Sequence, residues 1–349
     1  MKKNLKIILF SIGSLFLAYA GLQLFVPTDW SGRQVEIRIP EGATYRQALS
    51  LLARNNLIRD KNLFILIGKL SGFDKRVRAG YYSFFGRMAP YQVFKRLRDG
   101  KIIEYEVAVL EGESLPEIGA KLAGYNIASF EEFTRISRDP DFLRQLDVQG
   151  PSLEGYLFPQ TYKIPKGVSP RSVLKVMVRT LREEFNSTLR ERARELGWSE
   201  NEVLTLASII EKEAVADSER PVISAVYHNR ILRRMPLQAD PTAIYGVKSS
   251  REKITPQDLR KKTEYNTYMI KGLPPGPIAS PGKKSILAAL YPAEVPYLYF
   301  VSQGNGTHYF SKTLAEHSAA IRRLRAQKAA LNGGTGEGIP VPASDPGEE

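Results

Sequence analysis

The stretch Leu206-Ala-Ser-Ile-Ile-Glu-Lys-Glu-Ala214 predicts a buried helix that carries a carboxylate, Glu211, on its apolar side. At about 100° per residue, the apolar residues of this segment fall in one broad sector, and Glu211 lies inside it. Ser199, followed three residues later by Glu202, forms a capping-box pattern that marks the start of the helix. Glu213 is expected on nearly the opposite side, so the two glutamates do not share one face.

Two interpretations of Glu211 follow from this layout. Apolar surroundings disfavour the charged form of a carboxylate, so the group keeps its proton near neutral pH and suits the role of general acid. Alternatively, Glu211 satisfies a buried arginine or a helix N-terminus elsewhere in the core. The residues three and four positions away include no basic partner. Glu211 is therefore the catalytic candidate, and Glu213 is expected to orient a neighbour or to pair with a base.

The N-terminus has the pattern of a membrane anchor. Lys2, Lys3 and Lys6 precede an uncharged, mostly apolar run from Ile7 to Val26, about the length needed to cross a bilayer. A retained helix would keep the lysines in the cytoplasm and place the rest of the chain outside. The alternative is a cleaved signal peptide, because Ala18-Tyr19-Ala20 resembles a processing site. The apolar character continues past that site, which favours the anchor.

Composition narrows the remaining function classes. The 349 residues include no cysteine, which excludes a lipoprotein anchor, a disulfide framework and a thiolate metal site. The net charge of +13 calls for an anionic neighbour. Because the basic residues are interleaved with acids and no nucleic-acid motif is present, a membrane surface or a wall polymer is expected instead of nucleic acid. His228, His308 and His317 lack metal-ligand spacing, and we expect neither metal nor cofactor.

An internal repeat precedes the Glu211 helix. Ile39-Pro-Glu-Gly42 followed by Thr44 recurs as Val109-Leu-Glu-Gly112 followed by Ser114. Each copy predicts a strand, a tight turn and a helix. Small modules of this kind resemble LysM-like glycan-binding domains, although ordinary packing also accounts for the pattern.

Other segments contribute elements and polar walls. Leu153-Glu-Gly-Tyr-Leu-Phe-Pro-Gln-Thr-Tyr162 is rich in aromatics and fits either a saccharide groove or a packed domain junction. Near the end, residues 297–301 and 307–310 predict a hairpin, followed by a helix over 314–331. The tail after Asn332 is expected to be disordered.

Taken together, the ordered segments resemble the endolytic murein transglycosylases, the MltG or YceG-like family. The segments that carry the resemblance are the N-terminal membrane helix, Leu153 to Tyr162, Ala207-Ser-Ile-Ile-Glu-Lys-Glu213, Asn229-Arg230, Leu237-Gln-Ala-Asp-Pro-Thr-Ala-Ile-Tyr-Gly246, Tyr265-Asn-Thr-Tyr268 and Gly272-Leu-Pro-Pro-Gly-Pro-Ile278. They extend over nearly the whole chain from the anchor to about Leu331.

The resemblance implies a single-pass enzyme of the bacterial cytoplasmic (inner) membrane, with its C-terminal domain on the periplasmic or extracellular side. It would cut the β-1,4 bond between N-acetylmuramic acid and N-acetylglucosamine in nascent peptidoglycan glycan strands, leaving 1,6-anhydromuramic ends. The family's catalytic glutamate is assigned to Glu211, acting first as acid and then as base. Penicillin-binding synthases are the implied protein partners, and the N-terminal module is expected to be LysM-like.

The expected fold is α+β, with an anchor over 1–29, a LysM-like module over 30–150, a catalytic domain over 151–331 and a tail over 332–349. The residues expected to bind substrate or stabilise an oxocarbenium-like state are Asn229, Gln238, Asp240, Tyr245, Asn266 and Tyr268. Two alternatives stay open. A muramidase-type hydrolase would use Asp240 with Glu211, and a non-catalytic scaffold would only bind the wall.

Overall fold

The structure, a computed structural model, describes residues 2–73, 77–248 and 252–331. The chain divides into two compact units. Unit 1 comprises Met1–Val107 and Tyr162–Ser169, and unit 2 comprises Ala108–Thr161 and Pro170–Glu349. Residues 108–150, expected in the LysM-like part, therefore pack in the same unit as the Glu211 helix. The tail predicted over 332–349 lies outside the described residues.

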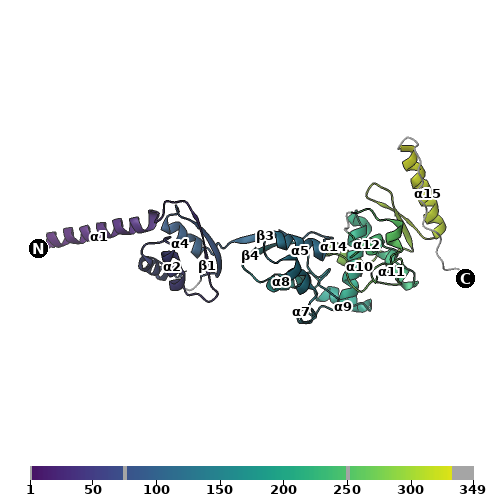
Figure 1. Ribbon diagram of the computed structural model, residues 1–349, viewed down its shortest axis with the longest axis horizontal. Helices are drawn as coiled ribbons and strands as arrows, with labels where there is room; N and C mark the ends of the chain where they lie inside the picture. The colour runs from purple at the N-terminus through teal and green to yellow at the C-terminus, as the bar shows by residue number, and fades with distance from the viewer. Residues whose placement is uncertain (1, 74–76, 249–251, 332–349) are drawn as a thin grey trace. The chain divides into compact units, whose positions relative to one another are not determined.

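The architecture is mixed α+β, as expected from the sequence (Figure 1). The elements of unit 1 are α1 (Lys2–Phe25), β1 (Gln34–Ile39), α2 (Tyr45–Arg54), α3 (Lys61–Leu70), β2 (Gly80–Phe85), α4 (Pro90–Arg98) and most of β3 (Glu104–Ala108) and β4 (Thr161–Pro165). The segment of α1 from Asn4 to Phe25 has a mean hydropathy of 1.9 and is almost unburied. By length and composition it is compatible with a single-pass membrane anchor.

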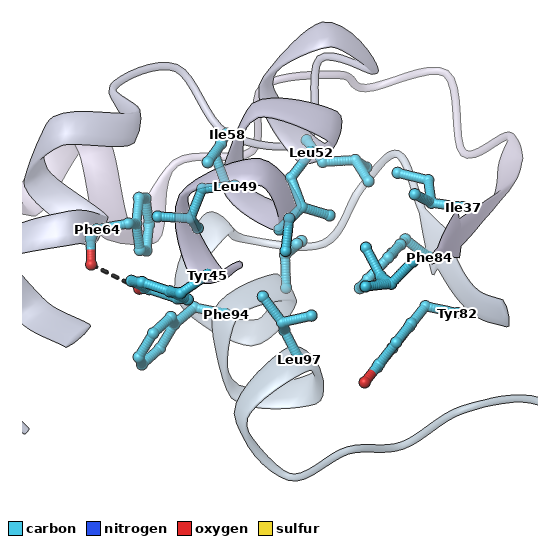
Figure 2. Packing of buried hydrophobic residues seen from close by; sticks show 14 of the residues in the cluster. Ile37, Tyr45, Leu49, Leu52, Ile58, Phe64, Tyr82, Phe84, Phe94 and Leu97 are labelled. Carbon is cyan, nitrogen blue, oxygen red and sulfur yellow. Dashed lines mark hydrogen bonds between the residues drawn. The ribbon is translucent and has the colours of Figure 1, made fainter. Parts of the chain in front are cut away.

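The core of unit 1 forms where strand alternation meets helical periodicity. β1 and β2 pair antiparallel, with Ile37 opposite Tyr82. Alternate side chains of both strands point inward, and Tyr82 stacks on Phe84 with ring centroids 6.0 Å apart. Helices α2, α3 and α4 cover this face with residues that include Leu49, Leu52, Phe64, Phe94 and Leu97 (Figure 2).

Unit 2 is mainly helical. Its elements are α5 (Leu115–Gly124), α6 (Phe130–Ser137), α7 (Pro140–Gln145), α8 (Pro170–Glu184), α9 (Ser187–Glu195), α10 (Glu200–Glu213), η2 (Asp217–Glu219), α11 (Arg220–Leu232), α12 (Asp240–Ile244), α13 (Pro256–Leu259), α14 (Lys283–Leu290), β5 (Tyr299–Ser302), β6 (His308–Ser311) and α15 (Leu314–Leu331). The predicted hairpin and last helix are confirmed as β5, β6 and α15. Helix α10 is central, because α9, α11, α12 and α14 all pack against it.

Both copies of the sequence repeat fold as a strand, a turn and a helix, which confirms the prediction. Thr44 begins α2 and Ser114 begins α5, and each backbone N–H donates at 2.8 Å to the side chain three residues on, Gln47 or Glu117. Two pairs of positive φ angles also match: 73° and 77° at Gly42 and Gly112, and 55° and 54° at Asn56 and Asn126. The repeat is therefore structural as well as sequential.

Gly68 illustrates how tightly the core of unit 1 is packed. The Tyr45 hydroxyl donates to the Phe64 carbonyl at 2.6 Å, which lays the ring across α3. A Cβ on Gly68 would lie 2.4 Å from Cε1 of Tyr45.

We expect Gly68→Ala to destabilise the protein by about 1–3 kcal/mol, because the Tyr45 ring would have to move. Gly124→Ala in α5 is the matched control, since a Cβ there meets nothing within 4 Å, and alanine in a helix is expected to be neutral or stabilising. Denaturant unfolding of both variants measures the difference. Equal stabilities would contradict the packing argument.

Candidate active site

The Glu211 helix is built as its sequence predicts. Ser199 caps α10 by accepting from the Glu202 N–H, and the Glu202 carboxylate accepts from the Ser199 N–H at 2.8 Å. Every residue from Val203 to Ile210 is buried. Glu213 is the last residue of the helix, where the unpaired carbonyl groups disfavour a negative charge.

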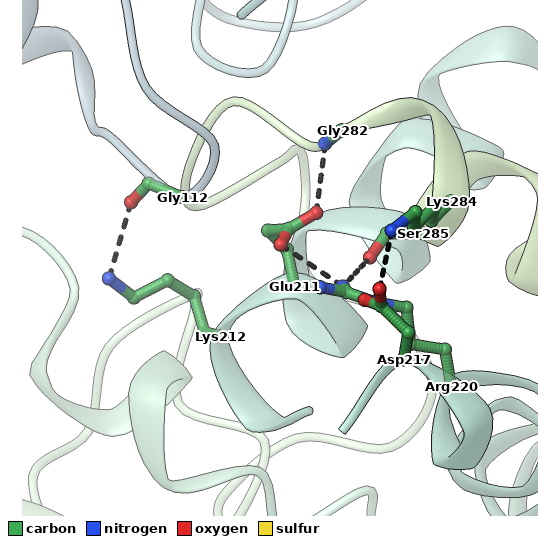
Figure 3. Close-up of polar contacts among 8 residues, drawn as sticks. All are labelled: Gly112, Glu211, Lys212, Asp217, Arg220, Gly282, Lys284 and Ser285. Carbon is green, nitrogen blue, oxygen red and sulfur yellow. Dashed lines mark hydrogen bonds and ion pairs between the residues drawn. The ribbon is translucent and has the colours of Figure 1, made fainter. Parts of the chain in front are cut away.

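The environment of Glu211 is polar and ionic, which corrects the expectation of an apolar one (Figure 3). Its Oε1 lies 3.0 Å from Nη1 of Arg220, and the side chains of the two residues are 6% and 8% exposed. Its Oε2 accepts from the Gly282 N–H at 2.9 Å. Gly282 is the N-cap of α14, so the carboxylate lies at a helix N-terminus, where negative charge is favoured.

Arg220 extends this pair into a cluster that joins three helices. Its Nη1 also donates to the Ser285 hydroxyl of α14, and its Nε lies 3.0 Å from Asp217. Asp217 in turn pairs with Lys284, and both cations hold its pKa below the usual range. Glu211 thus has the partners of a structural ion pair: a buried arginine and a helix N-terminus.

Replacing Glu211 by glutamine should destabilise the protein by on the order of 3 kcal/mol, because Arg220 would lose its buried counter-ion. Glu183→Gln is the control, since its pair with Arg179 is exposed and is expected to contribute less than about 1 kcal/mol. Thermal unfolding of the two variants gives the comparison. A stability of Glu211→Gln equal to that of Glu183→Gln would show that the ion pair is not structural.

A cavity of about 880 Å³ lies in unit 2, beside the end of α10. Its walls come from the turn before α5, the start of α5, the end of α10, α12 and the loop after α12. The polar residues that line it are Ser114, Glu117, Arg138, Glu154, Lys212, Glu213, Asp240, Tyr245 and Lys248. The second copy of the sequence repeat therefore forms one wall, through Gly112 and the first turns of α5.

Glu213, not Glu211, is the glutamate of the motif that lines this cavity. Burial raises its pKa to about 8, and the nearby negative charge of Asp240 adds to the shift. Its carboxylate accepts hydrogen bonds from the hydroxyl of Tyr227 and from the backbone N–H of Asp240. Near neutral pH this group holds a proton and lies on the cavity wall, as a general acid must.

Glu154 is a second carboxylate on the same wall, and it is buried. It is 1% exposed, and both of its oxygens accept from the Leu115 N–H at the start of α5, at 3.0 and 3.1 Å. The Tyr245 hydroxyl donates to its Oε2 at 3.0 Å. Burial raises the pKa of Glu154 to about 7, against these hydrogen bonds. Glu154 thereby fixes the orientation of Tyr245.

The structure brings some of the predicted substrate-binding residues to the cavity. Asp240 and Tyr245 line it, and the Tyr268 hydroxyl donates to Oδ1 of Asp240 at 2.5 Å. Burial raises the pKa values of both tyrosines, so both keep their hydroxyl protons and remain hydrogen-bond donors.

The other predicted residues bind protein groups instead. Nδ2 of Asn229 donates to the carbonyls of Val295 and Tyr297 at 2.8 and 2.9 Å. Gln238 accepts from Arg230 at 3.2 Å, and fully buried Asn266 donates to carbonyls of the preceding loop. None of the three is among the residues that line the cavity.

Sequence reasoning did not select Glu154, although a usable signal was present. It stands between Leu153 and Gly155 in a segment of aromatic and apolar residues, the same kind of context that drew attention to Glu211. Lys212 and Lys248 carried no comparable signal. Across the described residues, no cluster of three or more His, Asp and Glu side chains is placed to hold a metal ion.

Comparison with known proteins defines the class of protein. A sequence profile of the YceG-like family matches residues 37–323, and the chain belongs to that family. The family predicted from the ordered motifs is thereby confirmed.

Curated relatives refine the class. The chain is 32% identical over 334 residues to the endolytic murein transglycosylase of Bacillus subtilis (strain 168), covering 91% of this chain and 92% of that protein. It is 27% identical to the endolytic murein transglycosylase of Streptococcus pneumoniae serotype 2, covering 90% of this chain and 62% of the longer relative. The expected class of enzyme, a lytic transglycosylase, is confirmed by these relatives.

A crystal structure of a putative yceG-like protein from Listeria monocytogenes is also similar. It aligns with a TM-score of 0.58 and 31% sequence identity, covering 83% of this chain and all of that one.

Proposed function

We propose that this protein is a membrane-anchored endolytic lytic transglycosylase that cuts peptidoglycan glycan strands between N-acetylmuramic acid and N-acetylglucosamine, with Glu213 as its single acid and base. The observation that carries the proposal is the raised pKa of Glu213, about 8, on the wall of an 880 Å³ cavity. This assignment differs from the sequence prediction of Glu211. The contacts of Glu211 support the change, because both of its oxygens are bound by protein groups, Arg220 and the Gly282 N–H, and it does not line the cavity.

The proposed reaction needs one protein carboxyl group. Protonated Glu213 donates its proton to the glycosidic oxygen as that bond breaks, and positive charge develops at the anomeric carbon. The carboxylate then takes the proton of the sugar's 6-hydroxyl while that oxygen bonds to the anomeric carbon, which gives the 1,6-anhydro product. The nucleophile belongs to the substrate, so no second protein group has to position a water molecule.

Asp240 has two roles in this mechanism. Its negative charge helps to keep Glu213 protonated before the reaction, and it favours the oxocarbenium-like state during it. The Tyr268 hydroxyl donates a hydrogen bond to Oδ1 of Asp240, which fixes the orientation of the Asp240 carboxylate. A muramidase-type hydrolase would instead use Asp240 to activate water.

The membrane and wall contacts of the proposal rest on separate observations. The apolar helix α1 supports a single-pass anchor in the bacterial cytoplasmic membrane, with unit 2 and the part of unit 1 that follows α1 on the outer side. A LysM-like, glycan-binding unit 1 is supported by a cavity of about 490 Å³ lined by Gly42, Arg46, Gln47 and their neighbours, on the first copy of the repeat. Penicillin-binding synthases are the proposed protein partners.

Glu213→Gln should reduce transglycosylase activity of the purified protein by about 10²–10⁴-fold, because glutamine cannot donate a proton. Mass spectrometry of digested glycan strands measures the anhydromuramic ends. Folding should be retained: a carboxyl group whose pKa is raised on folding destabilises the native state as pH rises, and glutamine removes that cost.

Glu211→Gln is the comparison variant, assayed at a temperature where its unfolding is negligible. It should keep most of its activity. Loss of activity in folded Glu211→Gln together with full activity in Glu213→Gln would return the catalytic role to Glu211. For the unsubstituted protein, reducing ends as the main product would establish a hydrolase, and glycan strands left uncut would establish a scaffold.

The activity should fall as pH rises through about 8, because Glu213 must be protonated to act as the acid. Asp240→Asn should move this alkaline limb of kcat/KM to lower pH, since one cause of the raised pKa is removed. If the alkaline limb of Asp240→Asn stays at the same pH, Asp240 does not contribute to the raised pKa of the catalytic acid.

A further inference from the structure

The free part of helix α1 is shorter than the membrane it would cross. Its side chains from Leu5 to Tyr19 are exposed, whereas from Ala20 onward the helix begins to pack on the rest of unit 1, the part that follows α1. Gln23 is only 7% exposed, and Leu24 packs against the core of unit 1. The uncharged segment from Ile7 to Ala18, which precedes the first contact with the rest of unit 1, is about 18 Å long at 1.5 Å per residue, against about 30 Å for the hydrocarbon core of a bilayer.

Three contacts hold the end of α1 to unit 1. The Tyr19 hydroxyl donates to Asp60 at 2.8 Å. The Arg59 guanidinium donates to the carbonyls of Val26 and Pro27 at 2.8 and 2.6 Å, just after the helix ends. The ring of Phe25 lies 5.9 Å from that of Tyr91 in α4. Unit 1 is thereby fixed to the last turns of α1.

We propose that the part of unit 1 that follows α1 is embedded in the interfacial layer of the outer leaflet, which supplies the missing length of the membrane crossing. The inference rests on the proposed membrane anchoring. The side chains that form this membrane-facing surface, with their exposed fractions, are Leu22 (50%), Phe25 (62%), Trp30 (65%), Leu66 (48%), Leu70 (80%) and Tyr91 (40%).

Helix α3 contributes to this surface through its N-cap residue and its outer face. Asp60, which accepts from Tyr19, is also the N-cap of α3 and accepts from the Asn62 N–H at 2.8 Å. Helix α3 therefore begins at the level of Tyr19. Its inner face buries Phe64 and Gly68, while Leu66 and Leu70 point away from the core.

The chemistry of the surface fits a bilayer with anionic lipids. Trp and Tyr are enriched at membrane interfaces, where an apolar ring meets a wet edge, and the surface contains Trp30 and Tyr91. Exposed Lys61 and Lys69 on α3 add positive charge beside the apolar residues. A span that is too short is accommodated by thinning of the bilayer or by drawing flanking residues into it, and here those residues are apolar.

The absence of cysteine makes a direct test possible. The full chain, carrying a single nitroxide label at Leu66→Cys or Leu70→Cys, is reconstituted in phosphatidylcholine–phosphatidylglycerol vesicles. Two matched sites calibrate the readout: Phe10→Cys, 77% exposed in the free part of α1, and Glu41→Cys, exposed in the turn after β1. Electron paramagnetic resonance measures the ratio of accessibility to oxygen and to a water-soluble nickel complex.

We expect this ratio to be several-fold higher at Leu66 and Leu70 than at Glu41, and lower than at Phe10. A lipid value at Phe10 with water values at Leu66 and Leu70 would overturn the embedded surface while leaving the anchor intact. Water values at all four sites would overturn the anchoring itself and the inference with it. Transglycosylase activity of each labelled protein shows that it is folded.

Discussion

The buried ion pair between Glu211 and Arg220 determines how the rest of the candidate site is arranged. It joins α10 to α11, and through Gly282 and Ser285 it joins both to α14. Successive residues of a helix are about 100° apart, so fixing Glu211 toward α11 and α14 turns Glu213 to the other side. There Glu213 lines the cavity. The structural carboxylate of Glu211 thus orients the proposed catalytic carboxylate of Glu213, two residues away.

The same interaction explains how far the sequence could be interpreted. Helical periodicity correctly placed Glu211 toward the core and Glu213 opposite to it. The capping box at Ser199 was sufficient to predict the start of the helix. The order of the motifs was sufficient to predict the family. Sequence could not assign the two roles, because the partners of Glu211 come from later segments, Arg220 and Gly282, that only folding brings to it.

A similar cause explains why only some of the residues predicted to bind substrate line the cavity. Asp240 and Tyr245 begin and follow the short helix α12, whose side faces the cavity, whereas Asn229 and Asn266 satisfy backbone carbonyls of neighbouring loops. An amide side chain in a motif serves such carbonyls as well as it serves a sugar, because both offer acceptors. Residue type alone therefore did not distinguish the residues that line the cavity from those that support the fold. Elements set by local patterns, such as α10 and the final hairpin, were predicted closely.

The repeated turn has a consequence for how the protein can evolve. Both copies close the turn locally, with the Ala43 N–H donating to the Pro40 carbonyl at 3.2 Å and the Glu113 N–H donating to the Leu110 carbonyl at 3.3 Å. The second copy adds distant contacts: the Gly112 N–H donates to the Ser280 carbonyl at 2.8 Å, and the Leu115 N–H donates to the Glu154 carboxylate. Substitutions that shift the backbone of the second turn therefore disturb contacts with distant segments, whereas those in the first turn disturb only local ones. Although the two turns share one sequence pattern, we expect the second to tolerate fewer single substitutions than the first.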